Sequence, residues 1–207
     1  MNRFIDPIGE QTLEQLILTS LEGSIAAKKA FAKEQMEEML LLVQWTVEAL
    51  SSGNKLLIFG NGGSAADAQH MAAEFVNRFL IDRPPLAAIA LTTDSSILTS
   101  IGNDFSYDDI FSKQIIALGK PGDLALGIST SGNSPNVLAA VMKARELDCK
   151  TIGLTGKDGR KLAALCDACV LVPSGRTSRI QEAHITIGHI WCQIVDHRIA
   201  EHPHGGA

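Results

Sequence analysis

The sequence lacks any long hydrophobic run. Its richest apolar stretch, Met39–Val43, stops at Gln44, far short of the roughly 20 residues that a helix needs to cross a bilayer. The N-terminus carries Asp6, Glu10 and Glu14 and lacks the basic start and apolar stretch of a signal peptide. We therefore expect a soluble, cytoplasmic protein with no membrane partner.

Positive charge is also scarce. The 207 residues include 18 Lys and Arg against 23 Asp and Glu, which gives a net charge of −5. No local run of Lys or Arg is present that could follow a phosphate backbone. The composition therefore argues against a nucleic-acid partner.

Cysteine is rare, with four residues in the chain. In a protein without an export signal this indicates free thiols in a reducing compartment. Cys166 and Cys169 form a C-x-x-C pair, which could serve redox or metal chemistry. No second pair completes a four-thiolate site, and buried thiols are ordinary core residues. We interpret both as core residues.

The length and the 45% hydrophobic content predict a single domain over residues 1–207. Residues 1–52 form a helical segment, because Gln11–Leu50 is rich in helix formers and contains no turn signal besides Gly23. This stretch reads as one broken helix or two consecutive helices. Its apolar stripe is broad enough to favour packing against another subunit, although an intramolecular core face explains the same stripe. The stripe comprises Met36, Met39, Leu40, Val43, Val47 and Leu50.

After residue 52 the pattern changes to short apolar runs that alternate with helical segments. This pattern is typical of a parallel sheet covered by helices on both faces, and it predicts an α/β core over 53–200. The expected strands are Lys55–Phe59, Leu86–Leu91, Asp123–Ser129, Lys150–Leu154 and Cys169–Val172. The expected helices are Ser64–Phe79, Ser95–Ile101, Asp108–Leu118, Pro135–Leu147, Arg160–Leu165 and Ser178 to about Ala200. Residues 201–207 form a tail whose two His we do not expect to bind metal.

A glycine-rich loop follows the first expected strand. The run Gly60-Asn61-Gly62-Gly63-Ser64 leads into a helix, so the backbone can turn tightly and bring its amides close to a ligand. Ser64 and Asp67 form an S-x-x-D helix-start signal. The glycines are equally explained by a tight turn, and Gly60, Gly62 and Ala65 also fit the G-x-G-x-x-A dinucleotide pattern, which is weak alone.

A second loop follows the third expected strand and places four hydroxyl groups ahead of a helix. It reads Ser129-Thr130-Ser131-Gly132-Asn133-Ser134-Pro135. Ser134 suits the N-cap and Pro135 the first helical position, which leaves free N–H groups beside the hydroxyls. In the doubly wound strand order 2-1-3-4-5, strands one and three are neighbours, so both loops face one crevice. The sequence therefore predicts a phosphate cradle, which a sugar phosphate requires and a dinucleotide does not.

Two helices carry groups suited to acid–base or metal chemistry. His70 and Glu74 lie about 40° apart on one helix face, whereas Gln181 and His189 fall within about 80° and His184 points elsewhere. Each pair has a simpler explanation: a surface ion pair, a capping Gln, a buried His. Together, two His, a carboxylate and an amide oxygen suit a divalent metal, with zinc as first choice. The same groups suit an aldose–ketose exchange, with Glu74 as base and His189 as acid.

These segments together resemble the phosphoheptose isomerase family of SIS (sugar isomerase) proteins. The resemblance rests on Gly60–Phe75, Ser129–Ser134 and Arg179–His189 and extends from about Leu13 to Val195. It implies an SIS-type three-layer α/β sandwich, with a five-stranded parallel sheet in flavodoxin-like order and N-terminal helices for oligomer packing. It also implies a homotetramer that converts sedoheptulose 7-phosphate to D-glycero-D-manno-heptose 7-phosphate, the first step towards ADP-heptose.

The resemblance also implies individual roles. The implied substrate contacts are Asn61, Gly62, Gly63, Glu74, Asn103, Asp104, Ser129, Thr130, Ser131, Ser134 and Gln181. The implied ligands of one zinc per subunit are His70, Glu74, Gln181 and His189, and the implied base and acid are Glu74 and His189. From the residues alone, the pair that follows Gly102 favours turn formation over contact with a ligand.

Two other functions are weighed against the isomerase. A related SIS protein is a non-catalytic adaptor that binds the replication initiator DnaA, but binding alone would not require Glu74 and His189. A nicotinamide-dependent oxidoreductase is disfavoured because the first acidic residue after the second strand is Asp94, well beyond the expected distance of about 20 residues from the glycine loop.

Overall fold

The structure is a computed structural model that describes residues 12–201. The predicted tail, apart from Glu201, therefore lies outside the described residues. The chain forms a five-stranded parallel sheet in the order β2-β1-β3-β4-β5, which confirms the predicted flavodoxin-like order. The strands are β1 (Leu56–Gly60), β2 (Ala88–Ala90), β3 (Leu124–Ser129), β4 (Lys150–Gly156) and β5 (Ala168–Val172).

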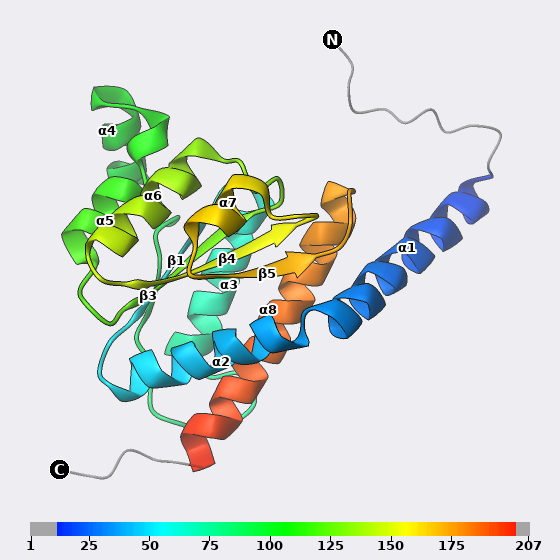
Figure 1. Cartoon of the computed structure of the whole chain (residues 1–207), viewed down its shortest axis with the longest axis horizontal. Helices are drawn as coiled ribbons and strands as arrows, with labels where there is room; N and C mark the ends of the chain where they lie inside the picture. Colours follow the sequence, from blue (N-terminus) through cyan, green and yellow to red (C-terminus); the bar gives the residue numbers. More distant parts are fainter. Residues whose placement is uncertain (1–11, 202–207) are drawn as a thin grey trace.

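Helices cover both faces of the sheet, as expected for the three-layer sandwich (Figure 1). One face packs against α1 (Leu13–Glu34), α2 (Met36–Ser51), α3 (Gly63–Val76) and α8 (Thr177–Glu201). The other packs against α4 (Ser95–Asp104), the 3₁₀ helix η1 (Tyr107–Asp109), α5 (Ser112–Leu118), α6 (Pro135–Glu146) and α7 (Arg160–Leu165). Every residue of β1 and β3 is buried, because a parallel strand in this architecture is covered on both sides.

The N-terminal segment consists of two helices that meet at Gln35. The Gln35 backbone leaves the helical region (φ −129°, ψ 25°), and its side-chain Oε1 accepts a hydrogen bond from the Leu171 N–H of β5 (2.9 Å). Helix α1 extends away from the sheet (Figure 1) and exposes large apolar side chains. These are Leu13, Ile17, Leu18, Leu21 and Ile25.

The apolar stripe of α2 is divided between core and surface. Met39, Val43 and Leu50 are buried in the domain core, whereas Met36 and Leu40 are exposed by 51% and 56%. The intramolecular explanation therefore accounts for the buried part of the stripe, and packing of the exposed part against another subunit stays a prediction. No described helix combines the length and the apolarity needed to span a membrane.

Several helix boundaries differ from the predicted ones. Helix α3 ends at Val76 rather than Phe79, since the Arg83 guanidinium binds the last carbonyl groups of the helix. Helix α4, capped by the Asp94 carboxylate, continues through Gly102 to Asp104. The expected helix 108–118 is divided into η1 and α5.

All four cysteines are free thiols. Burial raises the pKa of Cys149 to about 11 and that of Cys169 to about 12, and it raises the pKa of Cys166 and Cys192 as well. A thiol in such surroundings stays protonated at neutral pH and is a poor nucleophile or metal ligand. Cys166 and Cys169 are half-buried rather than fully buried as core residues, and their raised pKa argues against a reactive pair.

Candidate active site

The structure brings together His70 and Glu74 of α3 and His189 of α8. The His70 Nε2 lies 3.1 Å from the Glu74 Oε1 and 3.2 Å from the His189 Nε2. One ligand atom from each residue can be chosen so that all three lie within 4.8 Å of one another. The side chain of His70 is 45% exposed and that of Glu74 is 23% exposed, so the cluster is open to solvent. Two imidazole nitrogens and a carboxylate at this spacing fit the donor preferences of zinc.

Aromatic contacts fix the ring of His189. The Phe79 ring stacks on it in parallel, with centroids 5.5 Å apart and planes 6° apart, while the His70 ring meets it edge-on at 4.9 Å. Because Phe79 lies in the loop after α3, this loop belongs to the site. The sequence carried no signal for this contact, since Phe79 was expected to end the helix.

Gln181 lies beside the first loop, on the first turns of α8. A Cβ added at Gly63 would come within 2.6 Å of the Gln181 Nε2, so the amide packs directly against the start of α3. The structure thus joins the two predicted halves of the site, α3 with its loop and α8. The role of Gln181 as a metal ligand stays a prediction.

The first loop starts α3 without the expected capping interaction. Gly62 occupies the N-cap at φ 57°, no described side chain caps the helix, and Ser64 is buried within its first turn. The predicted S-x-x-D start signal is therefore wrong. Burial raises the pKa of Asp67 to about 6, and the nearby His70 opposes this shift. The Oδ2 of Asp67 is buried and has no hydrogen-bond partner among residues 12–201.

Asn61 is held by residues that the sequence did not indicate. Its Nδ2 donates to the Asn136 Oδ1 (2.8 Å), and its Oδ1 accepts from the Asn136 Nδ2 (2.9 Å) and from the Tyr107 hydroxyl (3.1 Å). Asn136, in the first turn of α6, is only 1% exposed. This reciprocal amide pair ties the first loop to the helix that follows the second loop.

The second loop gathers its hydroxyl groups. The Ser129 Oγ lies 2.9 Å from the Ser134 Oγ and 3.4 Å from the Ser131 Oγ. Thr130, which lies between Ser129 and Ser131 in the sequence, is half-buried. Ser134 does occupy the N-cap position of α6, but its side chain makes no capping bond, because the hydroxyl turns towards Ser129. Strands β1 and β3 pair side by side, with Gly60 opposite Ile128, so the two loops emerge next to each other as predicted.

Asn103 and Asp104 do not lie in a loop, as expected, but in the last turn of α4. Both are exposed, and the Asn103 Nδ2 donates to the Asp104 Oδ1 (2.8 Å). Among the described residues their side chains hydrogen-bond only to each other. The structure therefore places them apart from the hydrogen-bond network of the His70 cluster.

His184 is fully buried on the inner side of α8, with its Nε2 3.2 Å from the Thr155 carbonyl oxygen. Burial lowers the pKa of His184 to about 4, although the bond to Thr155 opposes this shift. Within the part of the chain that the structure describes, its Nδ1 has no hydrogen-bond partner. His184 therefore supports the fold as a neutral ring and does not join the cluster, consistent with its predicted direction.

Acidification should reveal this burial. The folded pKa of His184 lies below the unfolded value of roughly 6.5, so its contribution to stability is present above that pH and is lost as pH falls towards 4. Between pH 7 and pH 4.5 we expect the wild type to lose about 2 kcal/mol more unfolding free energy than His184→Gln, which keeps a donor for Thr155. Urea denaturation at both pH values measures this difference. The exposed His197→Gln is the control, and equal acid sensitivity of His184→Gln and wild type would contradict the assignment.

The chain is similar to proteins of one known family. The SIS domain family model matches residues 21–156, which makes the chain an SIS domain protein. It is 54% identical over 187 residues to the phosphoheptose isomerase of Solidesulfovibrio magneticus, covering 90% of this chain and 91% of that one. Phosphoheptose isomerase structures from Neisseria gonorrhoeae (46% identity, TM-score 0.85) and Francisella tularensis (39%, 0.87) each match 90% of this chain and 100% of their own. The chain belongs to the phosphoheptose isomerase family.

Proposed function

We propose that the protein is an aldose–ketose isomerase that converts sedoheptulose 7-phosphate to D-glycero-D-manno-heptose 7-phosphate, the first step of ADP-heptose biosynthesis. The observation that carries the proposal is the convergence of His70, Glu74 and His189 beside two loops suited to phosphate. Family membership supports the same substrate class.

The acid–base step follows from the positions of Glu74 and His189. The Glu74 carboxylate removes a proton from C1 of the ketose, next to the carbonyl carbon, while His189 gives a proton to the carbonyl oxygen. The resulting enediol collapses when Glu74 returns its proton to C2 and the C1 hydroxyl gives its proton to His189, which restores both residues. The exchange conserves all atoms and electrons and requires no redox cofactor. Phe79 and His70 hold the His189 ring in place during these transfers.

The phosphate group would lie at the two loops. Asn61, Gly62 and Gly63 offer backbone amides at the start of α3, and Ser129, Thr130, Ser131 and Ser134 offer hydroxyls at the start of α6. The positive ends of two helix dipoles favour an anion there. Gln181, together with Asn103 and Asp104, completes the proposed set of substrate contacts.

The proposal includes one zinc ion per subunit, held by His70, Glu74, Gln181 and His189. When bound, the ion would supply a Lewis acid that stabilises negative charge on the sugar oxygens. Glu74 can serve as both ligand and base, since a carboxylate has two oxygens. The His189 Nε2 faces the cluster and would hold the ion, so the proton that His189 donates would come from its other ring nitrogen, Nδ1.

We further propose a cytoplasmic homotetramer in which residues 1–207 form a single SIS domain. The exposed apolar side chains of α1, with Met36 and Leu40 of α2, support packing between subunits. The net negative charge argues against nucleic-acid partners.

Conversion of sedoheptulose 7-phosphate by the purified protein tests the function. The two sugars have equal mass, so the product is separated chromatographically, with added zinc in one arm and a chelator in the other. We expect turnover with zinc, at least about a 100-fold loss after chelation and recovery on adding zinc back. Full turnover by metal-free protein would contradict the metal role. Absence of turnover in both arms, from folded protein, would favour the adaptor.

A further inference from the structure

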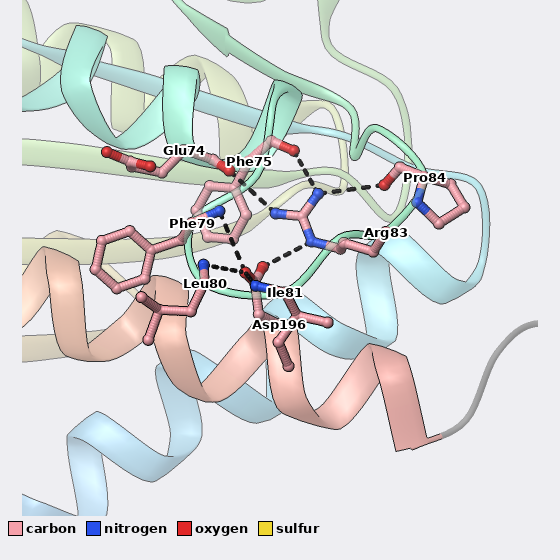
Figure 2. A network of polar contacts seen from close by, with 8 residues as sticks. All are labelled: Glu74, Phe75, Phe79, Leu80, Ile81, Arg83, Pro84 and Asp196. Atoms are coloured by element: carbon pink, nitrogen blue, oxygen red, sulfur yellow. Dashed lines mark hydrogen bonds and ion pairs between the residues drawn. The ribbon is translucent and has the colours of Figure 1, made fainter.

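A buried ion pair joins the loop after α3 to α8 (Figure 2). The Arg83 Nε donates to the Asp196 Oδ1 at 2.6 Å, and the two side chains are 2% and 0% exposed. A buried ion pair is a weak source of stability, because removing two charges from water costs about as much as their attraction returns. The position of this pair relative to the proposed acid and base suggests a different role.

Arg83 binds the end of the helix that carries the proposed base. Its Nη2 donates to the Glu74 carbonyl oxygen (3.0 Å), and its Nη1 donates to the carbonyl oxygens of Phe75 (2.8 Å) and Pro84 (3.2 Å). The last carbonyl groups of a helix have no partner within the helix. The planar guanidinium satisfies two of them at once and so fixes the backbone of Glu74 itself.

Asp196 binds the loop that holds the proposed acid. Its Oδ2 accepts hydrogen bonds from the backbone N–H groups of Phe79 (3.3 Å), Leu80 (3.2 Å) and Ile81 (3.5 Å). The Phe79 ring is the one that stacks on His189. Asp196 also follows His189 on the same helix by two turns. The carboxylate therefore links the ring and the aromatic group that holds it.

We propose that the Arg83–Asp196 pair positions Glu74 relative to His189 for proton transfer. This inference rests on the proposed roles of Glu74 and His189 as base and acid. Seven hydrogen bonds of the pair converge on the backbone around Glu74, on the Phe79 loop and on α8. None involves the loops proposed to bind phosphate. The pair therefore positions the groups that transfer protons and does not contribute to substrate affinity.

Asp196→Asn tests this separation. An amide offers one acceptor oxygen in place of two, so its NH₂ group must face either the Arg83 Nε–H or the loop N–H groups. We expect kcat for sedoheptulose 7-phosphate to fall about 10- to 100-fold, because small displacements of catalytic groups have effects of this size. The KM should stay within about threefold of the wild-type value, since the phosphate loops are untouched.

Asp123→Asn is the matched control for lost stability. Asp123 is 1% exposed and accepts hydrogen bonds from the backbone N–H groups of Lys55 (3.0 Å) and Lys120 (2.9 Å). It lies at the amino ends of β1 and β3, the opposite end of the sheet from the site. We expect Asp123→Asn to lower the melting temperature comparably to Asp196→Asn while kcat changes less than about twofold.

Arg83→Lys supplies a second, conservative variant. Lysine keeps the charge and can bind Asp196, but one ammonium group cannot reproduce the fork that reaches the Glu74 and Phe75 carbonyls. We expect a kcat between those of wild type and Asp196→Asn, again with little change in KM.

Three outcomes would overturn the inference. The first is a kcat for Asp196→Asn and Arg83→Lys no lower than that of Asp123→Asn at an equal loss of melting temperature. The second is a rise in the KM of these two variants that is as large as the fall in their kcat. The third is a wild type without turnover, which overturns the proposed function as well. An active wild type, an inactive Glu74→Gln and an unaffected Asp196→Asn would remove only the positioning role.

Discussion

Glu74→Gln should lower kcat for sedoheptulose 7-phosphate by about 10³-fold, because an amide cannot take the proton that the carboxylate removes from C1. Glutamine keeps the size of the side chain. It can still hydrogen-bond to the His70 Nε2, which lies 3.1 Å from the Glu74 Oε1 in the wild type. Substrate binding should therefore stay measurable, since the phosphate loops are unchanged.

The measurements are steady-state kinetics together with calorimetric binding of the substrate. Zinc content is determined on the same sample, because Glu74 is also a proposed ligand and metal loss alone would reduce turnover. The control is Glu146→Gln on the exposed face of α6, where the side chain pairs with Lys143. Retained turnover in Glu74→Gln would contradict the assignment of the base, and full zinc content with lost turnover would separate the base from the ligand.

Gly132→Ala should damage both the second loop and the fold. Gly132 is buried at φ +64°, and a Cβ there would clash with the backbone carbonyl group of Gly159 and approach the Thr155 Oγ1 at 3.2 Å. The loop cannot move away easily, since the Gly132 carbonyl accepts from the Leu162 N–H (3.0 Å). We expect a loss of about 2–4 kcal/mol in unfolding free energy and at least about a tenfold rise in KM, because the Ser131 and Ser134 hydroxyls would be displaced.

Alanine substitutions at two other glycines separate the cost of the steric clash from the cost of the positive φ. Gly53 has φ +77° with nothing within 4 Å of an added Cβ, so Gly53→Ala measures the cost of the backbone conformation alone, about 1 kcal/mol. Gly102, inside α4, has open space and no positive φ, and alanine should be neutral or slightly stabilising there. Urea denaturation and KM are compared across the three variants. A Gly132→Ala protein that matches Gly53→Ala in stability and keeps its KM would contradict the expected clash.

The sequence predicted the sheet because its signals are local. Each strand is a short apolar run between helical segments, and burial on both faces selects such runs. The expected strand Leu86–Leu91 pairs only at Ala88–Ala90, but the order of the strands is as expected. The i, i+4 spacing of His70 and Glu74 likewise predicted a shared helix face, because that geometry is a property of the helix itself.

What the sequence did not predict depends on contacts between distant segments. Arg83 and Asp196 are separated by 113 residues, and the end of α3 depends on their hydrogen bonds rather than on a local stop signal. The stack of Phe79 on His189 is equally non-local. Ser64 and Ser134 matched local helix-start patterns, but the first is buried inside its helix and the second binds Ser129. Tertiary packing decided these cases over local preference.

The adjacency of β1 and β3 has a thermodynamic consequence. The loops proposed to bind phosphate come directly from these central strands, and their pairing joins segments that are distant along the chain. A ligand that binds both loops recognises the folded sheet and not the unfolded chain, so occupancy of the site is linked to global unfolding. A ligand at 100 times its dissociation constant would then stabilise the whole domain by about 2.7 kcal/mol. In the cell, the supply of substrate would itself protect the protein from unfolding and proteolysis.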